Sequence, residues 1–417
     1  MTAGGRSSGA GARSRVLIIE QGDGLWGAQR YLLRLAPLLE ERGFEQILAA
    51  PGDSAIAQAW REQGRPHVHF PVPEVRRVRR RGDQGPFSPL LVGRELVRTV
   101  ANARRVSALT ALLGADCVAA NGHWTHLEAA LGGRLAQLPV VLHLHELTQP
   151  GIAGHLRAAA VRIADASVAV SRAVADCLPQ RTRSRVTVIH NGIDPVAFSP
   201  GPASPGVRRE LAADPTAPVV LSLGRLDRDK GVDHLIRAVA ALPGELARTQ
   251  LAVVGSGDLD RRFTSDLRAL GGELLGRRAR FLDPRHDIAV LLRTADVLVL
   301  PSAREGLPLV ILEAQACGIP VVAYPAAGTT EIVTDGETGL LARQGDVGSL
   351  ASCIGRVLAD TALRARLVAA ARSQVVAHFT LQEQVDRQVR LLNRLGVGRR
   401  QDHRGPTRAA ARHGPPR

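Results

Sequence analysis

The sequence is poor in aromatic residues, at 3% of the chain, and has one methionine, one lysine and four cysteines. The cysteines are scattered and form no Cys-x-x-Cys pair, which argues against a zinc site or a disulfide framework and predicts a cytoplasmic protein. No apolar run approaches the roughly 18 residues of a membrane span. The small, polar start of the chain has no apolar segment of a secretory signal, so we expect neither feature.

The net charge of +15 is concentrated in three short segments. Residues 1–15, Arg76–Arg81 and Gly398–Arg417 together carry thirteen of those charges, so the rest of the chain is nearly neutral. A nucleic-acid binder would interleave basic and aromatic residues on its folded body, and we therefore expect no nucleic-acid partner. The cluster Arg76–Arg81 predicts either a solvated loop or peripheral contact with an anionic membrane surface.

Short apolar runs alternate with amphipathic helical patterns, once between Arg15 and His190 and again from Pro218 onward. A stretch rich in proline, glycine and serine, Asn191–Gly206, separates the two series. Alternation of this kind predicts an α/β protein with two doubly wound, Rossmann-like parallel-sheet domains facing across a cleft. Ligands of such sheets bind beyond the carboxyl ends of the strands, so the loops that follow strands are the candidates for a site.

The stretch Pro301–Gly318 follows a predicted buried strand and contains a predicted helix. Pro308 suits the start of this helix and Gly318 its end. Glu305 then lies on the strand-to-helix loop and Glu313 more than one turn into the helix. Free N–H groups at a helix N-terminus suit a phosphate, and two carboxylates beside it suit sugar hydroxyls. Alternatively, both glutamates are solvated charges that favour this end of a helix.

A second loop, Gly224–Gly231, brings Arg225 and Lys230 after another predicted strand. Two cations there suit a diphosphate, and lysine is a common phosphate binder. Because Lys230 is the only lysine in a chain that otherwise uses arginine, we favour a binding role over surface charge. Glycines in two further loops, Gly27 and Gly255, would permit close approach of a ligand to the backbone.

The end of the predicted strand around residues 139–145 carries the imidazole of His145, followed by Glu146. An imidazole in that position could contact a sugar hydroxyl, although a structural histidine is the usual alternative. His143 shares the strand, so the choice between the two stays open, with His123 and His126 as weaker candidates. Thr329, in the segment Ala326–Val333, follows another strand and is a further candidate.

These motifs resemble the retaining, nucleotide-sugar-dependent glycosyltransferases of family 4, which have the GT-B fold. The likeness covers about residues 15–395. It rests on the order and spacing of PSAREGLPLVILEA, GRLDRDKG, VVGSG, HNGID and AGTTEIV. The pair Glu305 and Glu313 matches the family's E-x7-E pattern. One departure is Trp26 before Gly27, where the family commonly has two glycines.

The resemblance implies a role for each matching residue. Glu305 would contact the transferred sugar and His145 would lie near it as the other catalytic candidate, while Glu313 would bind the nucleotide ribose. Arg225 and Lys230 would hold the donor diphosphate. Backbone groups near the phosphates would come from Gly27, Gly255, Leu307, Pro308, Leu309 and Val310, and Asn191, Glu146 and Thr329 are further candidates.

The function implied is that of a hexosyltransferase, which moves a sugar from a nucleoside-diphosphate sugar to an acceptor hydroxyl of a glycan, lipid or small molecule. Neither a metal nor a cofactor is expected. Alternatives are a GT-B nucleotide-sugar epimerase and a catalytically silent nucleotide-sugar-binding subunit. The expected domains are an acceptor domain at 15–192 with a returning helix at 380–396, and a donor domain at 193–379. Disordered tails are expected at 1–14 and 397–417.

Overall fold

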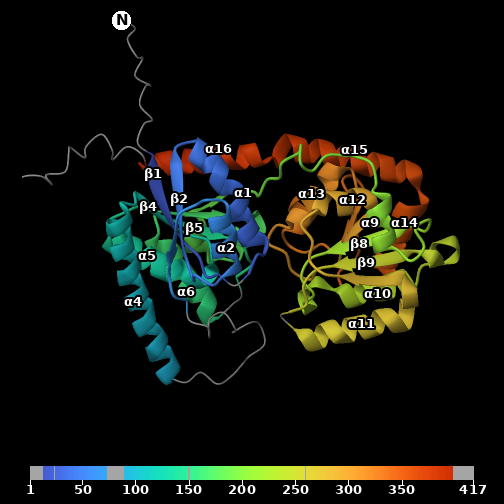
Figure 1. The fold of residues 1–417 in the computed structure, drawn as a ribbon, viewed down its shortest axis with the longest axis horizontal. Coiled ribbons are helices and arrows are strands. Elements are labelled where there is room, and N and C mark those ends of the chain that lie inside the picture. The colour runs from blue at the N-terminus through green and yellow to red at the C-terminus, as the bar shows by residue number, and fades with distance from the viewer. Residues whose placement is uncertain (1–12, 23, 73–88, 149–150, 259, 398–417) are drawn as a thin grey trace, which may run out of the picture.

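The computed structural model describes residues 13–397 except 23, 73–88, 149–150 and 259, and the side chains of 89–92 are also outside the description. These residues form two α/β halves, each built around one parallel sheet (Figure 1). The predicted fold class is confirmed. The cluster Arg76–Arg81 and the two predicted disordered tails lie mainly or wholly outside the described residues, and the predicted domain bounds stay predictions.

The first sheet has the order β3-β2-β1-β4-β5-β6-β7, and its ladders are parallel. Its strands are β1 (Ser14–Ile19), β2 (Phe44–Ala50), β3 (His67–His69), β4 (Cys117–Ala120), β5 (Val140–Leu144), β6 (Ala166–Ala169) and β7 (Val186–Val188). Its helices are α1 (Gly27–Glu41), α2 (Ala55–Glu62), α4 (Pro89–Leu113), η1 (His123–Thr125), α5 (His126–Leu135), α6 (Ile152–Ile163), α7 (Arg172–Asp176) and α8 (Gln180–Arg183).

The second sheet has the order β10-β9-β8-β11-β12-β13, again with parallel ladders. Its strands are β8 (Val219–Leu223), β9 (Gln250–Val254), β10 (Ala279–Leu282), β11 (Val297–Leu300), β12 (Val321–Ala323) and β13 (Leu340–Leu341). The remaining helices are α9 (Pro205–Leu211), η2 (Arg228–Lys230), α10 (Val232–Ala240), η3 (Gly244–Arg248), α11 (Arg261–Leu275), η4 (Gly276–Arg278), α12 (Ile288–Thr294), α13 (Leu309–Cys317), η5 (Thr329–Glu331), α14 (Val347–Ala359), α15 (Thr361–His378) and α16 (Leu381–Arg394). Helix α9 starts inside the stretch that the sequence predicts as linker.

The last two helices connect the halves, and Figure 1 shows them in red along one side of the molecule. Helix α15 packs against α13, whereas the buried face of α16, with Val385, Leu391 and Leu392, joins the core formed by β1 and α1. The chain passes between the halves at Gly192, where a Cβ atom would lie 2.2 Å from the Thr380 carbonyl oxygen. The glycine of the HNGID motif is therefore required by packing alone.

Both sheets reverse their strand order at one point, between β1 and β4 in the first half and between β8 and β11 in the second. Ligands of open α/β sheets bind beyond the carboxyl ends of the strands at this kind of point. The loops after β8 and β11 contain Arg225, Lys230 and Glu305, and those after β1 and β4 begin with Glu20 and Asn121. The fold thus brings the predicted donor residues to one place.

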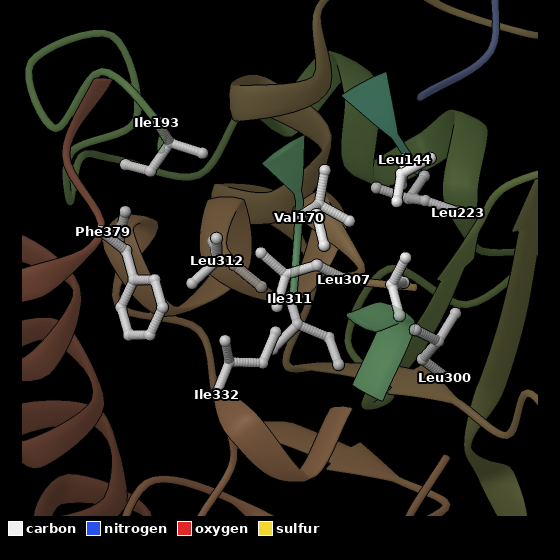
Figure 2. Close-up of a cluster of buried hydrophobic side chains, with 14 of the residues drawn as sticks. Leu144, Val170, Ile193, Leu223, Leu300, Leu307, Ile311, Leu312, Ile332 and Phe379 are labelled. Carbon is white, nitrogen blue, oxygen red and sulfur yellow. The ribbon is translucent and has the colours of Figure 1, made fainter. Parts of the chain in front are cut away.

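A single apolar cluster includes side chains at the carboxyl ends of both sheets (Figure 2). Leu144 and Val170 come from the first half, and Leu223, Leu300 and Leu307 come from the second. All five are buried. Burial of each such side chain contributes roughly 1.5–3 kcal/mol. Apolar packing therefore supports the arrangement in which the two halves meet.

Candidate donor and acceptor site

The loop between β11 and α13 is built as the sequence predicts. Pro308 lies immediately before the first helical residue, with φ −75°, and Gly318 ends the helix at φ +76°. Glu305 lies on the loop, and Glu313 is in the second turn with 7% of its side chain exposed. The backbone of Leu307–Val310 forms the entry to α13. The N–H groups in the first turn of a helix lack intrahelical partners, which makes this entry a site for an anion.

Lys230 and Glu305 form an ion pair, with 2.6 Å between Lys230 Nζ and Glu305 Oε1. Their side chains are only 19% and 11% exposed. The loop carrying Lys230 is held close because Gly231, at φ +63°, leaves no room for a Cβ atom, which would lie 2.2 Å from the Pro301 carbonyl oxygen. Removing one member of a buried ion pair typically costs about 3–5 kcal/mol. The pair therefore fixes both predicted donor residues in one geometry.

Arg225 contacts residues of both halves. Its Nη2 atom lies 3.1 Å from Asp227 Oδ2, and its guanidinium carbon lies 5.5 Å from the centre of the Trp26 ring. Trp26 is on the loop after β1, and Gly24 packs so tightly on its indole that an added Cβ would lie 2.4 Å from Nε1. The tryptophan that departs from the family pattern thus contributes a cation–π contact to the predicted diphosphate cation.

Two glycines bring the halves into contact beside Glu305. A Cβ on Gly306 would lie 2.1 Å from the His145 carbonyl oxygen, and one on Gly328 would lie 1.9 Å from the Gly306 carbonyl oxygen. The Gly328 N–H donates to the Glu305 carbonyl oxygen at 3.0 Å. Because three backbone segments meet here, His145 and Glu305 lie on adjoining loops from opposite halves.

His145 belongs to a polar network at the end of the first sheet. Asn121 donates from Nδ2 to Glu20 Oε2 at 2.6 Å, so its Oδ1 atom is the acceptor for His145 Nε2–H at 2.7 Å. The other ring nitrogen, Nδ1, is then left as an acceptor. Burial, together with a smaller effect of the neighbouring His143, lowers the pKa of His145 to about 3, so the ring is neutral near pH 7.

The structure separates the histidines that the sequence left open. His143 is 8% exposed, its Nδ1 atom lies 3.1 Å from the Tyr31 hydroxyl, and burial lowers its pKa to about 4. His126 is 2% exposed and bonds through Nε2 to the His143 carbonyl oxygen at 3.0 Å. His123 lies beside Glu146, 3.6 Å from its carboxylate. Of these four, His145 adjoins the donor loops.

Other candidates have structural explanations or buried polar atoms. A Cβ on Gly255 would lie 1.6 Å from the Gly224 carbonyl oxygen, so packing between neighbouring loops requires this glycine. Gly27 is exposed, with open space around its Cβ position. Asn191 Oδ1 and Thr329 Oγ1 are buried and have no hydrogen-bond partner within the described residues. No group of three or more His, Cys, Asp and Glu side chains in this part of the chain is placed to hold a metal ion.

Sequence reasoning missed several polar residues of the site. Glu20 is fully buried and accepts hydrogen bonds from Gly22 N–H and Gln29 Nε2 as well as from Asn121. Glu20 and Asn121 directly follow buried strands, which is the signal that would have found them. Arg34 was also missed: its Nη2 atom donates to Glu313 Oε1 at 2.6 Å. Nothing in the pattern of α1 indicates that contact between the halves.

Known proteins match this chain in both halves. Residues 26–196 match the family described as Glycosyltransferase Family 4, and residues 205–374 match Glycosyl transferases group 1. The alpha-maltose-1-phosphate synthase of Mycolicibacterium smegmatis is 30% identical over 286 residues, which cover 62% of this chain and 73% of that protein. The chain belongs to glycosyltransferase family 4.

This family 4 chain spans about half the length of other relatives that it matches. The D-inositol 3-phosphate glycosyltransferase of Stackebrandtia nassauensis is 41% identical over 212 residues, which cover 48% of this chain and 47% of that protein. Among solved structures, Anabaena HepE in complex with UDP has a TM-score of 0.75 at 24% identity, with 91% of this chain and 100% of that chain covered. Sucrose-phosphate synthase from Thermosynechococcus elongatus has a TM-score of 0.71 at 24% identity, with 92% and 99% covered. These structural likenesses show the shared GT-B fold.

Proposed function

We propose that the protein is a retaining glycosyltransferase that moves a sugar from a nucleoside diphosphate to an acceptor hydroxyl. The observation that carries this proposal is the ion pair of Lys230 with Glu305 on the loop before α13, with Glu313 in the second turn of that helix. Arg225 lies on the same loop as Lys230, and His145 lies on the adjoining loop of the other half. A helix entry with two cations suits the diphosphate, and the carboxylates suit the ribose and sugar hydroxyls.

In the proposed reaction the acceptor oxygen forms a bond to the anomeric carbon while the bond from that carbon to the diphosphate oxygen breaks. The leaving phosphate takes the acceptor proton, and attack from the same face retains the configuration. Arg225 and Lys230 would stabilise the charge that develops on the diphosphate. His145 would accept a hydrogen bond from a sugar hydroxyl at Nδ1, because Nε2–H is engaged by Asn121.

A donor screen tests this function first. Thermal shifts are measured with UDP-, GDP-, ADP- and TDP-sugars, because a ligand that binds the folded state raises its apparent stability. The donor that stabilises the protein is then incubated without acceptor, and slow release of nucleoside diphosphate is expected. Stabilisation without release would favour a silent binding subunit, and conversion to another nucleotide sugar would favour an epimerase. No stabilisation by any donor would contradict the proposal. Activity is expected to persist in EDTA.

We also propose a small acceptor that carries a phosphate. The names of two relatives contain inositol 3-phosphate and maltose-1-phosphate. Arg157 of α6 has free donors for a phosphate. Its Nη1 atom donates to Thr148 Oγ1 and the Glu146 carbonyl oxygen, while its other nitrogens have no hydrogen bond to any described residue. Arg157 also lies near enough to His145 to lower the pKa of that ring. Transfer to polyol and sugar phosphates should exceed transfer to their unphosphorylated forms, and should fall in Arg157→Ala.

We also propose that the protein is cytoplasmic and that it contacts an anionic membrane surface. Helix α4 follows the undescribed cluster Arg76–Arg81 and exposes Leu96, Val97 and Val100 at 56%, 71% and 47%. No helix among the described residues is both long and apolar enough to cross a membrane. Flotation with anionic and neutral vesicles tests the contact: binding to anionic vesicles alone, weakened by salt, is expected. Equal recovery with both would contradict it.

A further inference from the structure

Helix α1 carries two arginines, Arg30 and Arg34, that no motif assigns to the site. They are four residues apart and therefore share one helix face. Arg34 donates from Nη2 to Glu313 Oε1 at 2.6 Å, across the boundary between the halves. Its other terminal nitrogen, Nη1, is buried and has no hydrogen-bond partner among the described residues. Glu313 Oε2 also has no hydrogen bond within that part of the chain, so the carboxylate is held at one oxygen and open at the other.

Arg30 lies one turn nearer the start of α1. Burial lowers the pKa of its guanidinium, while Glu313 raises it and Arg34 lowers it, which places all three charges in one neighbourhood. An arginine nevertheless stays protonated in proteins. Arg225, Lys230 and Arg34 each have a carboxylate partner at 3.1 Å or less. Arg30 differs from them because its side chain forms no hydrogen bond with any described residue.

The direction of α1 explains what this cation faces. At its start, Trp26 contacts Arg225, which is a predicted diphosphate ligand. Two turns later, Arg34 contacts Glu313, the predicted ribose ligand. With a rise of 1.5 Å per residue, these two contacts are separated by about 12 Å along the axis, with Arg30 midway. The span from the ribose to the terminal phosphate of a nucleoside diphosphate fits within that length. Figure 1 shows α1 on the side of the first half that faces the second.

We infer that Arg30 is a further donor-binding residue, whose guanidinium binds a phosphate oxygen of the nucleoside diphosphate from the acceptor-side half, and that Arg34 is a positioning residue for Glu313. This inference rests on the proposed function. The first half would then bind the donor directly. Nucleotide binding would therefore favour the approach of the two halves, and their approach would favour nucleotide binding. Arginine suits this role because its planar fork matches phosphate oxygens.

The test is titration calorimetry of the full chain with UDP, GDP, ADP and TDP, together with competition by the corresponding nucleosides. Arg30→Ala is expected to weaken the diphosphate about 10- to 100-fold, as for loss of a charge-assisted hydrogen bond, and to leave nucleoside binding within about twofold. Arg30→Lys should recover part of the loss, since it keeps the charge without the fork. Arg34→Ala should instead weaken nucleoside and diphosphate by the same factor, because Glu313 loses its fixed position.

Arg42→Ala is the matched control, because it removes the same charge from the end of the same helix, where Arg42 pairs with Asp386 on the surface. It should bind every ligand as the wild type does. Equal losses of nucleoside and diphosphate in Arg30→Ala, or no loss at all, would overturn the phosphate contact. Additive losses in Arg34→Ala and Glu313→Gln would overturn the positioning role, because residues that act together are not additive. If the wild type bound none of the four diphosphates, the proposed function itself would fail.

Discussion

The two halves of the molecule prepare their parts of the site in different ways. The donor side, in the second half, is made of charged side chains that pair with one another, as in Lys230 with Glu305 and Arg225 with Asp227. The acceptor side, in the first half, is made around His145, which is held neutral by burial and oriented by an amide. Paired charges have to be shared with an arriving diphosphate. A neutral ring held by Asn121 is already in its working form.

This difference suggests that substitutions act differently in the two halves. On the donor side, a substitution removes charge from a partly buried pair and changes how a charged ligand is held. On the acceptor side, a substitution changes hydrogen-bonding direction and the response to acid, with little effect on net charge near neutral pH. The predictions below use that contrast.

The largest effect is expected from breaking the pair on the donor side. Glu305→Gln and Lys230→Ala should each lower kcat/KM about 100- to 1,000-fold, the scale for loss of one group that stabilises developing charge. Both substitutions should also lower the stability, because each leaves a largely buried charge without its partner. Steady-state kinetics and thermal melts measure both. Arg343→Ala, which removes an 81% exposed cation from the same half, is the control and should leave both unchanged.

The second largest effect is expected from acid, which should lower the stability of the first half more than that of the second. Burial lowers the pKa of His126 well below its usual value, that of His143 to about 4 and that of His145 to about 3. The unfolded chain, with histidine pKa values near 6.5, therefore binds protons more readily than the folded one. The contribution of these neutral histidines to the free energy of unfolding is fully present above about pH 6.5. As the pH falls below about 6.5, each histidine lowers the free energy of unfolding by up to about 1.4 kcal/mol per pH unit.

Hydrogen exchange at pH 7.5 and pH 5 measures this effect separately in each half, and protection in the first half should fall first. His126→Gln is the matched variant, because its amide nitrogen can keep the hydrogen bond to the His143 carbonyl oxygen. It should make the loss of stability with acid less steep. The same pH dependence in the variant and the wild type would show that His126 has no part in it.

The sequence predicted the layout of the site better than its contacts. The loop from Pro301 to Gly318 was predictable because proline and glycine mark the start and end of a helix after a buried strand. Alternation of strands and helices likewise indicated the two parallel sheets. The contacts of Arg34 with Glu313 and of Trp26 with Arg225 join residues 279 and 199 positions apart, and they depend on how the halves meet. No periodicity within α1 encodes that arrangement.

Gly255 and Gly306 show a second limit of sequence reasoning. A glycine after a strand can serve a ligand or a neighbouring backbone, and both uses require the same absence of a side chain. The structure assigns packing to both: Gly255 fits against Gly224, and Gly306 fits against the His145 carbonyl oxygen. The second contact still matters for the site, since it sets the distance between the halves. Whether the Gly255 backbone also approaches a phosphate stays a prediction.

The smallest effect is expected where the halves meet through Trp26. Trp26→Ala removes the ring over Arg225, a contact that contributes roughly 0.5–2 kcal/mol in comparable settings. The KM for the donor should rise about threefold to tenfold while kcat changes little, because Arg225 keeps its charge and its pairing with Asp227. The KM of Trp26→Phe should lie between those of the wild type and Trp26→Ala. In an Arg225→Ala background the same change should have no further effect on KM, since the ring then has no cation to hold. A full additional loss there would show that Trp26 acts on something other than Arg225.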